Sequence, residues 1–380
     1  MRIVADENIP LLEEFFGDIG EIVRVPGRDL QPRDVVDADI LLVRSVTPVN
    51  EGLLSGSRVK FVGTATIGTD HIDREWLSKQ GIQFASAPGC NASGVVEYVL
   101  VCLSLIAEQE GCPLADLSVG LVGAGNVGGE LWHRLERLGM TVKVSDPPLE
   151  EQGGSGFSPL DEVLECDVVS LHTPLTLEAP YATRHLINAA RLSQFRAGQT
   201  LINTSRGAVV DNQALLGRMH EEPGLRVVLD VWESEPDINP DLLAQVWLGT
   251  PHIAGYTLEG KMKGTEMIYQ ALCRYLGLPV RKKAGQFMLE PPLGKLSFTS
   301  QASPEYAMEI AMRACYDPRR DDAALRRTLG LPEATRAEAF DALRKHYGVR
   351  REFGSTKVQL KSGSSGLQPY FKVLGFKVKV

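Results

Sequence analysis

A glycine-rich turn between a strand and a helix constrains the fold of this chain more than any other feature. The apolar run Ser118–Val122 leads into Gly123-Ala124-Gly125-Asn126-Val127-Gly128, which opens an amphipathic helical pattern extending to Leu138. In such a turn the first glycine allows the tight bend, the second lets a pyrophosphate approach the backbone, and the third permits close packing of helix on strand. Free N–H groups at the start of the following helix favour the binding of a phosphate group. We therefore predict that Gly123, Gly125, Asn126, Val127 and Gly128 bind a dinucleotide.

The next apolar strand supports this interpretation and indicates which dinucleotide is bound. Thr141–Ser145 ends in Asp146, which lies 18 positions after Gly128. A carboxylate about 20 residues beyond such a turn hydrogen-bonds the ribose diol. Pro147 and Pro148 follow without an adjacent Arg, so a 2′-phosphate would meet a carboxylate and no cation. NAD is favoured over NADP. The alternative is a glycine-rich turn in an unrelated α/β fold.

Short apolar strands alternate with helical or polar stretches on both sides of a long apolar helix, Ser93–Glu108. Near-continuous apolar strands of this kind are typical of buried parallel sheets. The alternation predicts an α/β chain with two doubly wound sheets. The expected strands are Arg2–Ala5, Ile22–Val25, Ile40–Val43, Val59–Gly63 and Ile82–Ala85 before the helix, and Ser118–Val122, Thr141–Ser145, Val168–Leu171, Thr200–Thr204 and Val227–Leu229 after it.

The pattern changes after a further predicted helix, Leu258–Leu276, which ends at Gly277 with Pro279 just beyond. The remaining segment is too long for a cap and too patterned for disorder. We expect a flexible loop at 362–366. The segment is otherwise predicted to contain helices Ser303–Cys315, Asp322–Leu329 and Thr335–Tyr347, and strands Lys357–Leu360 and Tyr370–Val380.

Bulk properties exclude several classes of protein. A chain of 380 residues is too long for one core. The net charge is −8 and no long Lys/Arg run is present, which argues against a nucleic-acid partner. The six cysteines form no CxxC pair, so no metal site is indicated. Because the chain opens directly as a strand and no apolar run reaches about 20 residues, we expect a cytoplasmic protein without a membrane partner.

Polar segments follow several strands of the second run, where ligands of open α/β sheets bind. Oxidation of an alcohol by hydride transfer requires a base, and His252 is the candidate because imidazole titrates near neutral pH. A neighbouring carboxylate, Glu235, would orient it. Arg206 can hold a substrate carboxylate in a bidentate manner. These segments lie at 172–176, 203–207, 230–236 and 250–255.

At this point the chain resembles the D-isomer-specific 2-hydroxyacid dehydrogenases over roughly residues 1–285, including the motifs at 63–73 and 88–91. The resemblance implies that Arg206, Glu235 and His252 are catalytic, with Glu235 preferred over Glu233 because it directly precedes Pro236. It also implies a flavodoxin-like domain and a Rossmann domain separated by a deep cleft. Asp230 would hold the nicotinamide carboxamide, Asp146 the ribose, and Thr173, Ser205 and Gly255 would line the cofactor.

Within this family, other residues indicate a small phosphorylated hydroxy acid as substrate. Arg44, Ser45 and Thr66 of the first domain, and Tyr256 after the Ala254-Gly255 pair, are the expected contacts. The long C-terminal region resembles an α+β dimerisation domain and predicts a homodimer. The predicted domains are 1–92 with 258–285 for the substrate (the lid), 93–257 for NAD, and 286–380 for dimerisation. Two alternatives stay open: a dehydrogenase of another D-2-hydroxy acid (glycerate or phosphoglycerate type), and an NADH-sensing corepressor-like binding protein.

Overall fold

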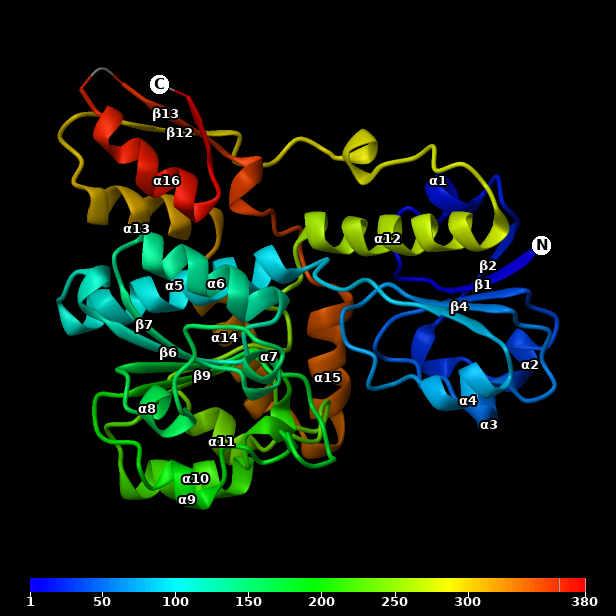
Figure 1. The fold of residues 1–380 in the computed structure, drawn as a ribbon, viewed down its shortest axis with the longest axis horizontal. Coiled ribbons are helices and arrows are strands. Elements are labelled where there is room, and N and C mark those ends of the chain that lie inside the picture. Colours follow the sequence, from blue (N-terminus) through cyan, green and yellow to red (C-terminus); the bar gives the residue numbers. More distant parts are fainter. Residues whose placement is uncertain (362, 380) are drawn as a thin grey trace. The chain divides into compact units, whose positions relative to one another are not determined.

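The structure is a computed structural model that describes residues 1–361 and 363–379 (Figure 1). The chain forms two compact units. The first unit contains residues 1–91 and 257–290, and the second contains residues 92–256 and 291–380. Each unit has its own buried core, built around its own parallel sheet.

The first unit is a parallel sheet with the strand order β2-β1-β3-β4-β5 and helices on both faces (Figure 1). This is the order of flavodoxin-type folds, and it confirms the predicted strands. Helices α1 and α12 cover one face, and α2, α3 and α4 cover the other. The strands are β1 (Arg2–Asp6), β2 (Glu21–Val25), β3 (Ile40–Val43), β4 (Phe61–Thr64) and β5 (Gln83–Ala85), and the helices are α1 (Leu12–Phe16), α2 (Pro32–Val35), α3 (Glu51–Leu54), α4 (Arg74–Lys79) and α12 (Leu258–Leu276).

The second unit contains a Rossmann-like parallel sheet with the order β11-β10-β9-β8-β6-β7. After β6 and β7, the chain crosses back to add β8 on the other side of β6. Folds of this type bind nucleotides at the point where the order of strands reverses, here between β6 and β8. One strand, β11, is too short for the sequence pattern to predict. The strands are β6 (Ser118–Val122), β7 (Thr141–Ser145), β8 (Val168–Leu171), β9 (Thr200–Asn203), β10 (Arg226–Leu229) and β11 (Leu248–Gly249), and the helices are α6 (Asn126–Arg137), α7 (Pro147–Glu151), α8 (Leu160–Leu164), α9 (Ala189–Leu192), α10 (Asn212–Glu221) and α11 (Pro240–Gln245).

Helix α5 (Ala92–Glu110) begins the second unit and is apolar nearly all round, as predicted. Its length and composition would suffice to cross a membrane, but most of it is buried inside the protein. It packs against α6 and against α13 of the C-terminal segment, so several of its faces contact protein. The absence of a polar stripe on α5 therefore follows from its place in the core.

The C-terminal segment forms a small parallel sheet with the order β12-β13-β14, flanked by helices. The strand predicted over Tyr370–Val380 is wrong in its first half, where Phe371 and Leu374 are buried at helical spacing and Gly375 ends a helix with φ 98°. Strand β12 was not predicted. Positions 362 and 380 lie outside the described residues. The elements are β12 (Lys295–Phe298), α13 (Pro304–Cys315), α14 (Arg319–Arg326), α15 (Glu333–Lys345), β13 (Lys357–Leu360), α16 (Gln368–Leu374) and β14 (Lys377–Lys379).

This segment shares a core with the sheet that precedes it. Phe298, Phe353 and Phe371 belong to the same buried cluster as Leu131 and Leu135 of α6. A domain boundary at residue 286 stays a prediction.

Arg350 adds polar contacts between the two parts of the second unit. Its guanidinium is buried and donates to the carbonyl oxygens of Ala254 and Gly94, each at 2.8 Å. It also lies 3.6 Å from the ring centroid of Tyr316. Arg350 therefore anchors the C-terminal segment to the loop after β11. It is not part of a solvated charged face.

Candidate active site

The candidate site lies at the carboxyl edge of the second sheet. Strands β8, β9, β10 and β11 are parallel, so the segments that follow them emerge at the same edge. These segments carry Thr173, Ser205, Arg206, Asp230 and the loop 250–255. The polar residues predicted to act together are thus brought to one edge by the topology alone.

Asp230 organises the loop that contains His252. Its Oδ1 accepts hydrogen bonds from the Thr250 hydroxyl and the Ile253 amide, both at 2.7 Å, and its Oδ2 accepts one from the Ala254 amide at 3.0 Å. Burial raises the pKa of Asp230, and the nearby His252 and these hydrogen bonds only partly offset that rise. A carboxylate accepts about four hydrogen bonds, so the Oδ2 of Asp230 can accept a further one.

His252 is held by Glu235. The Nδ1 of His252 and the Oε2 of Glu235 are 2.7 Å apart, and the Oε1 of Glu235 accepts from the Trp232 amide at 2.8 Å. Burial raises the pKa of Glu235, but the charge and hydrogen bond of His252, the charge of Arg344 and the Trp232 amide together outweigh it, so that this pKa lies below its ordinary value. Glu235 is therefore ionised at neutral pH. With Nδ1 committed to Glu235, Nε2 is the ring nitrogen left for a substrate proton.

The backbone of His252 is strained. Its φ of 56° lies in the left-handed region, which costs a non-glycine residue roughly 1–2 kcal/mol. The His252 amide donates to the Asp230 carbonyl at 2.7 Å, which holds this conformation. Strained backbone that the surroundings hold in place is common at functional sites.

Glu233 has different partners from Glu235. Its Oε1 lies 2.7 Å from Nε2 of His185, and its Oε2 accepts from the Asn212 amide at 2.8 Å. Ser234, with φ 63°, turns the chain between the two acids. Of these two acids, Glu235 is the one that contacts His252.

Arg206 lies in a loop after β9 that the side chain of Asn203 cross-links by hydrogen bonds. The side chain of Asn203 accepts from the Ser205 amide and hydroxyl at 3.0 and 2.8 Å, and donates to the Arg206 carbonyl at 2.9 Å. Gly207 begins a 3₁₀ turn (Gly207–Val209), and a Cβ there would lie 2.0 Å from the Trp232 backbone. The Arg206 loop thus packs directly on the segment that ends in Glu235. The side chain of Asn203 was not singled out from the sequence.

The glycine turn has the shape that a dinucleotide requires. Gly123 has φ 93°, and a Cβ on Gly128 would lie 1.9 Å from the Gly123 carbonyl oxygen. A Cβ on Gly125 would meet nothing within 4 Å, which leaves open space above the turn. Helix α6 begins at Asn126 without a side-chain cap. Its first amides are therefore available to a phosphate.

Two further residues fit the same cofactor. Asp146 follows β7, and its Oδ2 accepts from the Ala124 amide of the turn at 2.7 Å, while its Oδ1 caps α7 through the Leu149 amide at 3.1 Å. Thr173 has a buried hydroxyl without a hydrogen-bond partner in the described part of the chain. A buried polar atom without a partner is unfavourable unless a ligand satisfies it. The residues present therefore fit a bound dinucleotide.

His172 precedes Thr173 but does not suit the role of base. Its ring nitrogens contact the hydroxyls of Ser170 at 2.9 Å and Thr204 at 3.3 Å. Burial lowers the pKa of His172 to about 3. The ring is therefore neutral at working pH, and the backbone of His172 lies close to Gly123 of the glycine turn.

The predicted substrate contacts of the first unit differ in their surroundings. Arg44 forms a two-pronged ion pair with buried Asp6, at 3.0 Å from Nε and 3.3 Å from Nη2. Ser45 is exposed in the turn after β3. The Thr66 hydroxyl lies 2.8 Å from that of Thr64, which also contacts Nε2 of His71 at 3.0 Å. His71 thus supports the loop structurally, and the roles of Arg44, Ser45 and Thr66 stay predictions.

Tyr256 contacts a residue that the sequence did not single out for this site. Nη2 of Arg344, from α15, donates to the Tyr256 hydroxyl at 3.0 Å, and the guanidinium lies 5.6 Å from the ring centroid. Nothing in a helical pattern distinguishes a partly buried cation from a solvated one.

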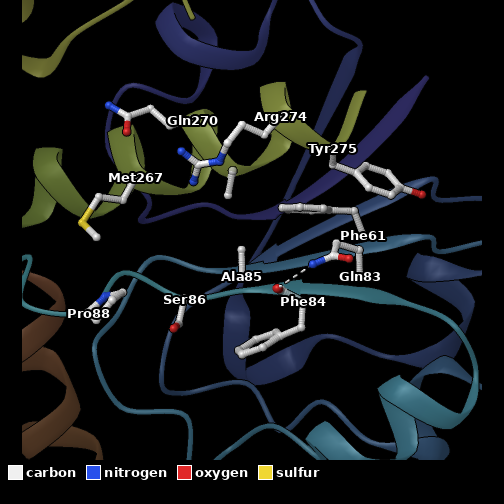
Figure 2. Close-up of a pocket in the computed structure, with 11 residues that line it drawn as sticks. Phe61, Gln83, Phe84, Ala85, Ser86, Pro88, Met267, Gln270, Arg274 and Tyr275 are labelled. Atoms are coloured by element: carbon white, nitrogen blue, oxygen red, sulfur yellow. Dashed lines mark hydrogen bonds between the residues drawn. The ribbon is translucent and has the colours of Figure 1, made fainter. Parts of the chain in front are cut away.

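A pocket of about 570 Å³ in the first unit lies between the sheet and α12 (Figure 2). Figure 2 shows Arg274 and Gln270 above Ala85 and Ser86, with Phe61 and Tyr275 at one end. None of the predicted substrate contacts lines it. We assign no role to this pocket.

Comparison with known proteins identifies the class. The family model described as "D-isomer specific 2-hydroxyacid dehydrogenase, NAD binding domain" matches residues 106–254, and a domain of unknown function (DUF3410) matches residues 287–372. The D-lactate dehydrogenase of Aquifex aeolicus, solved with NAD and lactic acid, is 26% identical with a TM-score of 0.61 and covers 73% of this chain and 96% of its own. The NAD⁺-bound 3-phosphoglycerate dehydrogenase of Entamoeba histolytica is 26% identical with a TM-score of 0.62, covering 74% and 99%. Fold and site define an NAD-binding D-2-hydroxyacid dehydrogenase.

Curated relatives identify a narrower family within this class of dehydrogenases. The erythronate-4-phosphate dehydrogenase of Marinobacter nauticus is 63% identical over 100% of both chains. That of Hahella chejuensis is 52% identical over 100% of this chain and 99% of its own. The chain belongs to the erythronate-4-phosphate dehydrogenase family within the D-isomer-specific 2-hydroxyacid dehydrogenases.

Proposed function

We propose that this protein oxidises 4-phospho-D-erythronate to 2-oxo-3-hydroxy-4-phosphobutanoate with NAD as the hydride acceptor. The observation that carries the proposal is the 2.7 Å contact between Glu235 and His252, at the same sheet edge as Arg206. The full-length relatives named erythronate-4-phosphate dehydrogenase support this choice of substrate.

The chemistry follows from the residues at the sheet edge. His252 takes the proton of the 2-hydroxyl at Nε2, and Glu235 stabilises the resulting imidazolium through Nδ1. Bound NAD supplies the acceptor for the hydride that leaves C2. Arg206 binds the substrate carboxylate with two nitrogens and stabilises the forming carbonyl. The proton and the hydride leave the same carbinol, so the product is a 2-oxo acid.

The cofactor residues have separate tasks. The glycine turn, with Asn126 and Val127 at the start of α6, holds the pyrophosphate, and Asp146 accepts from the ribose diol. Asp230 accepts from the nicotinamide carboxamide through its remaining capacity. The buried hydroxyl of Thr173, together with Ser205 and Gly255, lines the site around the nicotinamide end.

The cellular setting forms the second part of the proposal. The reaction belongs to the synthesis of pyridoxal 5′-phosphate and takes place in the cytoplasm. The protein is a homodimer that pairs through residues 286–380. The exposed Tyr306 on α13 supports this, because 57% of its surface is open to solvent while the opposite face of the helix is buried.

One assay tests the proposed activity. NADH formation is followed at 340 nm (the absorbance of the reduced nicotinamide) with 4-phospho-D-erythronate, D-glycerate and 3-phospho-D-glycerate. Preferred turnover of 4-phospho-D-erythronate is expected. Preference for either glycerate would favour a dehydrogenase of another hydroxy acid, and NADH binding without any turnover would favour a corepressor-like protein.

A further inference from the structure

The side chain of Arg344 is partly buried, and its surroundings are unusual for a cation in such a place. Its Nε is buried and has no hydrogen-bond partner among residues 1–361 and 363–379. The same described residues form no ion pair with it, and its direct polar contact is the neutral hydroxyl of Tyr256 at 3.0 Å. Buried charges in proteins are normally paired or coordinated. This guanidinium therefore has unused capacity to bind an anion.

Arg344 is directed at the candidate active site. It packs on Tyr256, four positions after His252 in the loop organised by Asp230. Its charge is close enough to contribute to the lowered pKa of Glu235, after burial and the larger effects of His252. An anion bound by Arg344 would consequently lie on the side of the site shared by Tyr256 and Glu235.

The other candidate cations already have a partner or another assigned role. Arg44 already pairs with the carboxylate of Asp6, which is 1% exposed, through two of its nitrogens. Arg206 is assigned to the carboxylate next to the reacting carbon. A substrate with two anionic ends needs a second cation for its phosphate. Arg350 already donates to two carbonyl oxygens through both of its terminal nitrogens, whereas Arg344 forms no ion pair among the described residues and has a buried Nε without a partner there.

We propose that Arg344 and Tyr256 together bind the phosphate group of the substrate. The inference rests on the proposed function and assigns a specificity role to the C-terminal segment of the same chain. A guanidinium presents paired donors that match phosphate oxygens, and the hydrogen bond from Arg344 to the Tyr256 hydroxyl places a phenol beside those donors. The unpartnered Nε of Arg344 would gain a phosphate oxygen.

The test compares Arg344→Gln, Arg344→Lys and Tyr256→Phe with the control Lys345→Gln, which removes the adjacent exposed charge on α15. Each variant is assayed with 4-phospho-D-erythronate and with D-erythronate, which lacks the phosphate. Arg344→Gln is expected to lower kcat/KM for the phosphorylated acid by roughly 10- to 150-fold, mainly through KM. Activity with D-erythronate is expected to stay near that of the wild type. Arg344→Lys should recover part of the loss, and Lys345→Gln should behave as the wild type.

A binding measurement separates this inference from the proposed activity. Inorganic phosphate is expected to raise the melting temperature of the wild type and of Lys345→Gln but not of Arg344→Gln, with NADH fluorescence confirming that each variant is folded. Equal losses for both substrates, or phosphate stabilisation that persists in Arg344→Gln, would overturn the inference. A wild type that binds phosphate through Arg344 but does not oxidise 4-phospho-D-erythronate would refute the proposed function alone.

Discussion

The contact between Glu235 and His252 allows a quantitative prediction for Glu235→Gln. The carboxylate accepts from the Trp232 amide through Oε1 and meets Nδ1 of His252 through Oε2, both within 2.8 Å. A glutamine has one oxygen for these two donors. If that oxygen stays on the Trp232 amide, the amide NH₂ faces Nδ1 and favours the tautomer with the proton on Nε2. That tautomer cannot accept the substrate proton.

The size of the effect follows from the lost charge-assisted hydrogen bond. Such a bond contributes about 1.5–3 kcal/mol, which corresponds to roughly 10- to 150-fold in kcat. His252 and Glu235 side chains are 30% and 18% exposed, so solvent screening places the effect toward the lower end of that range.

The substitution Glu235→Gln is also expected to change the dependence of kcat/KM on pH. A general base accepts the substrate proton only in its unprotonated form, so the rate of oxidation falls when the base is protonated at acid pH. Glu235 has a pKa below its ordinary value and carries its charge throughout that range, which favours the imidazolium. Removing the charge moves the acid limb of the kcat/KM profile to lower pH.

The assay is the rate of NADH formation from 4-phospho-D-erythronate between pH 5 and 10 for the wild type, Glu235→Gln and Glu233→Gln. Glu233→Gln removes the same charge two positions away, from a residue that contacts His185. An acid limb that does not move in Glu235→Gln, or that moves equally in Glu233→Gln, would refute the pairing as the source of the effect.

Three further predictions concern cofactor choice, packing and assembly. Asp146→Ser combined with Pro147→Arg is expected to raise kcat/KM with NADP relative to NAD, and an unchanged ratio in steady-state assays would count against the role of Asp146. Gly207→Ala places a Cβ 2.0 Å from backbone and is expected to destabilise by about 1–3 kcal/mol in urea unfolding; its control Gly217→Ala, in α10 with nothing within 4 Å, should stabilise by about 0.5–1 kcal/mol. Tyr306→Asp is expected to shift the sedimentation of the intact protein from dimer toward monomer, and a variant that sediments as the wild type would exclude α13 from the interface.

Much of the fold of the second unit could be predicted because each sequence pattern that indicates it lies within a short stretch of the chain. The glycine turn, Asp146 and the polar segments after the strands each lie within a few residues of an apolar strand, and a parallel sheet brings their ends together. The choice of Glu235 over Glu233 came from family resemblance, and the structure gives each acid a different partner.

The contacts that could not be predicted join residues far apart in the chain. The Tyr98 hydroxyl lies 2.9 Å from that of Thr250, yet Tyr98 occupies a helix that is apolar nearly all round and carries no sign of this role. Arg344 reaches Tyr256 across 88 positions. The helix α16 was predicted as a strand because alternating apolar residues fit both structures over so short a run.

The hydrogen bonds of Arg350 impose an order on the biosynthesis of this enzyme. Arg350 contacts the carbonyls of Ala254 and Gly94, so a nascent chain that ends before it lacks the anchor of the loop that carries His252. Domains generally fold from the amino terminus as synthesis proceeds. The glycine turn can therefore form early on the ribosome, whereas the contacts that tie the loop around His252 to the C-terminal segment form only when the chain is almost finished. A chain terminated before residue 350 would lack these contacts.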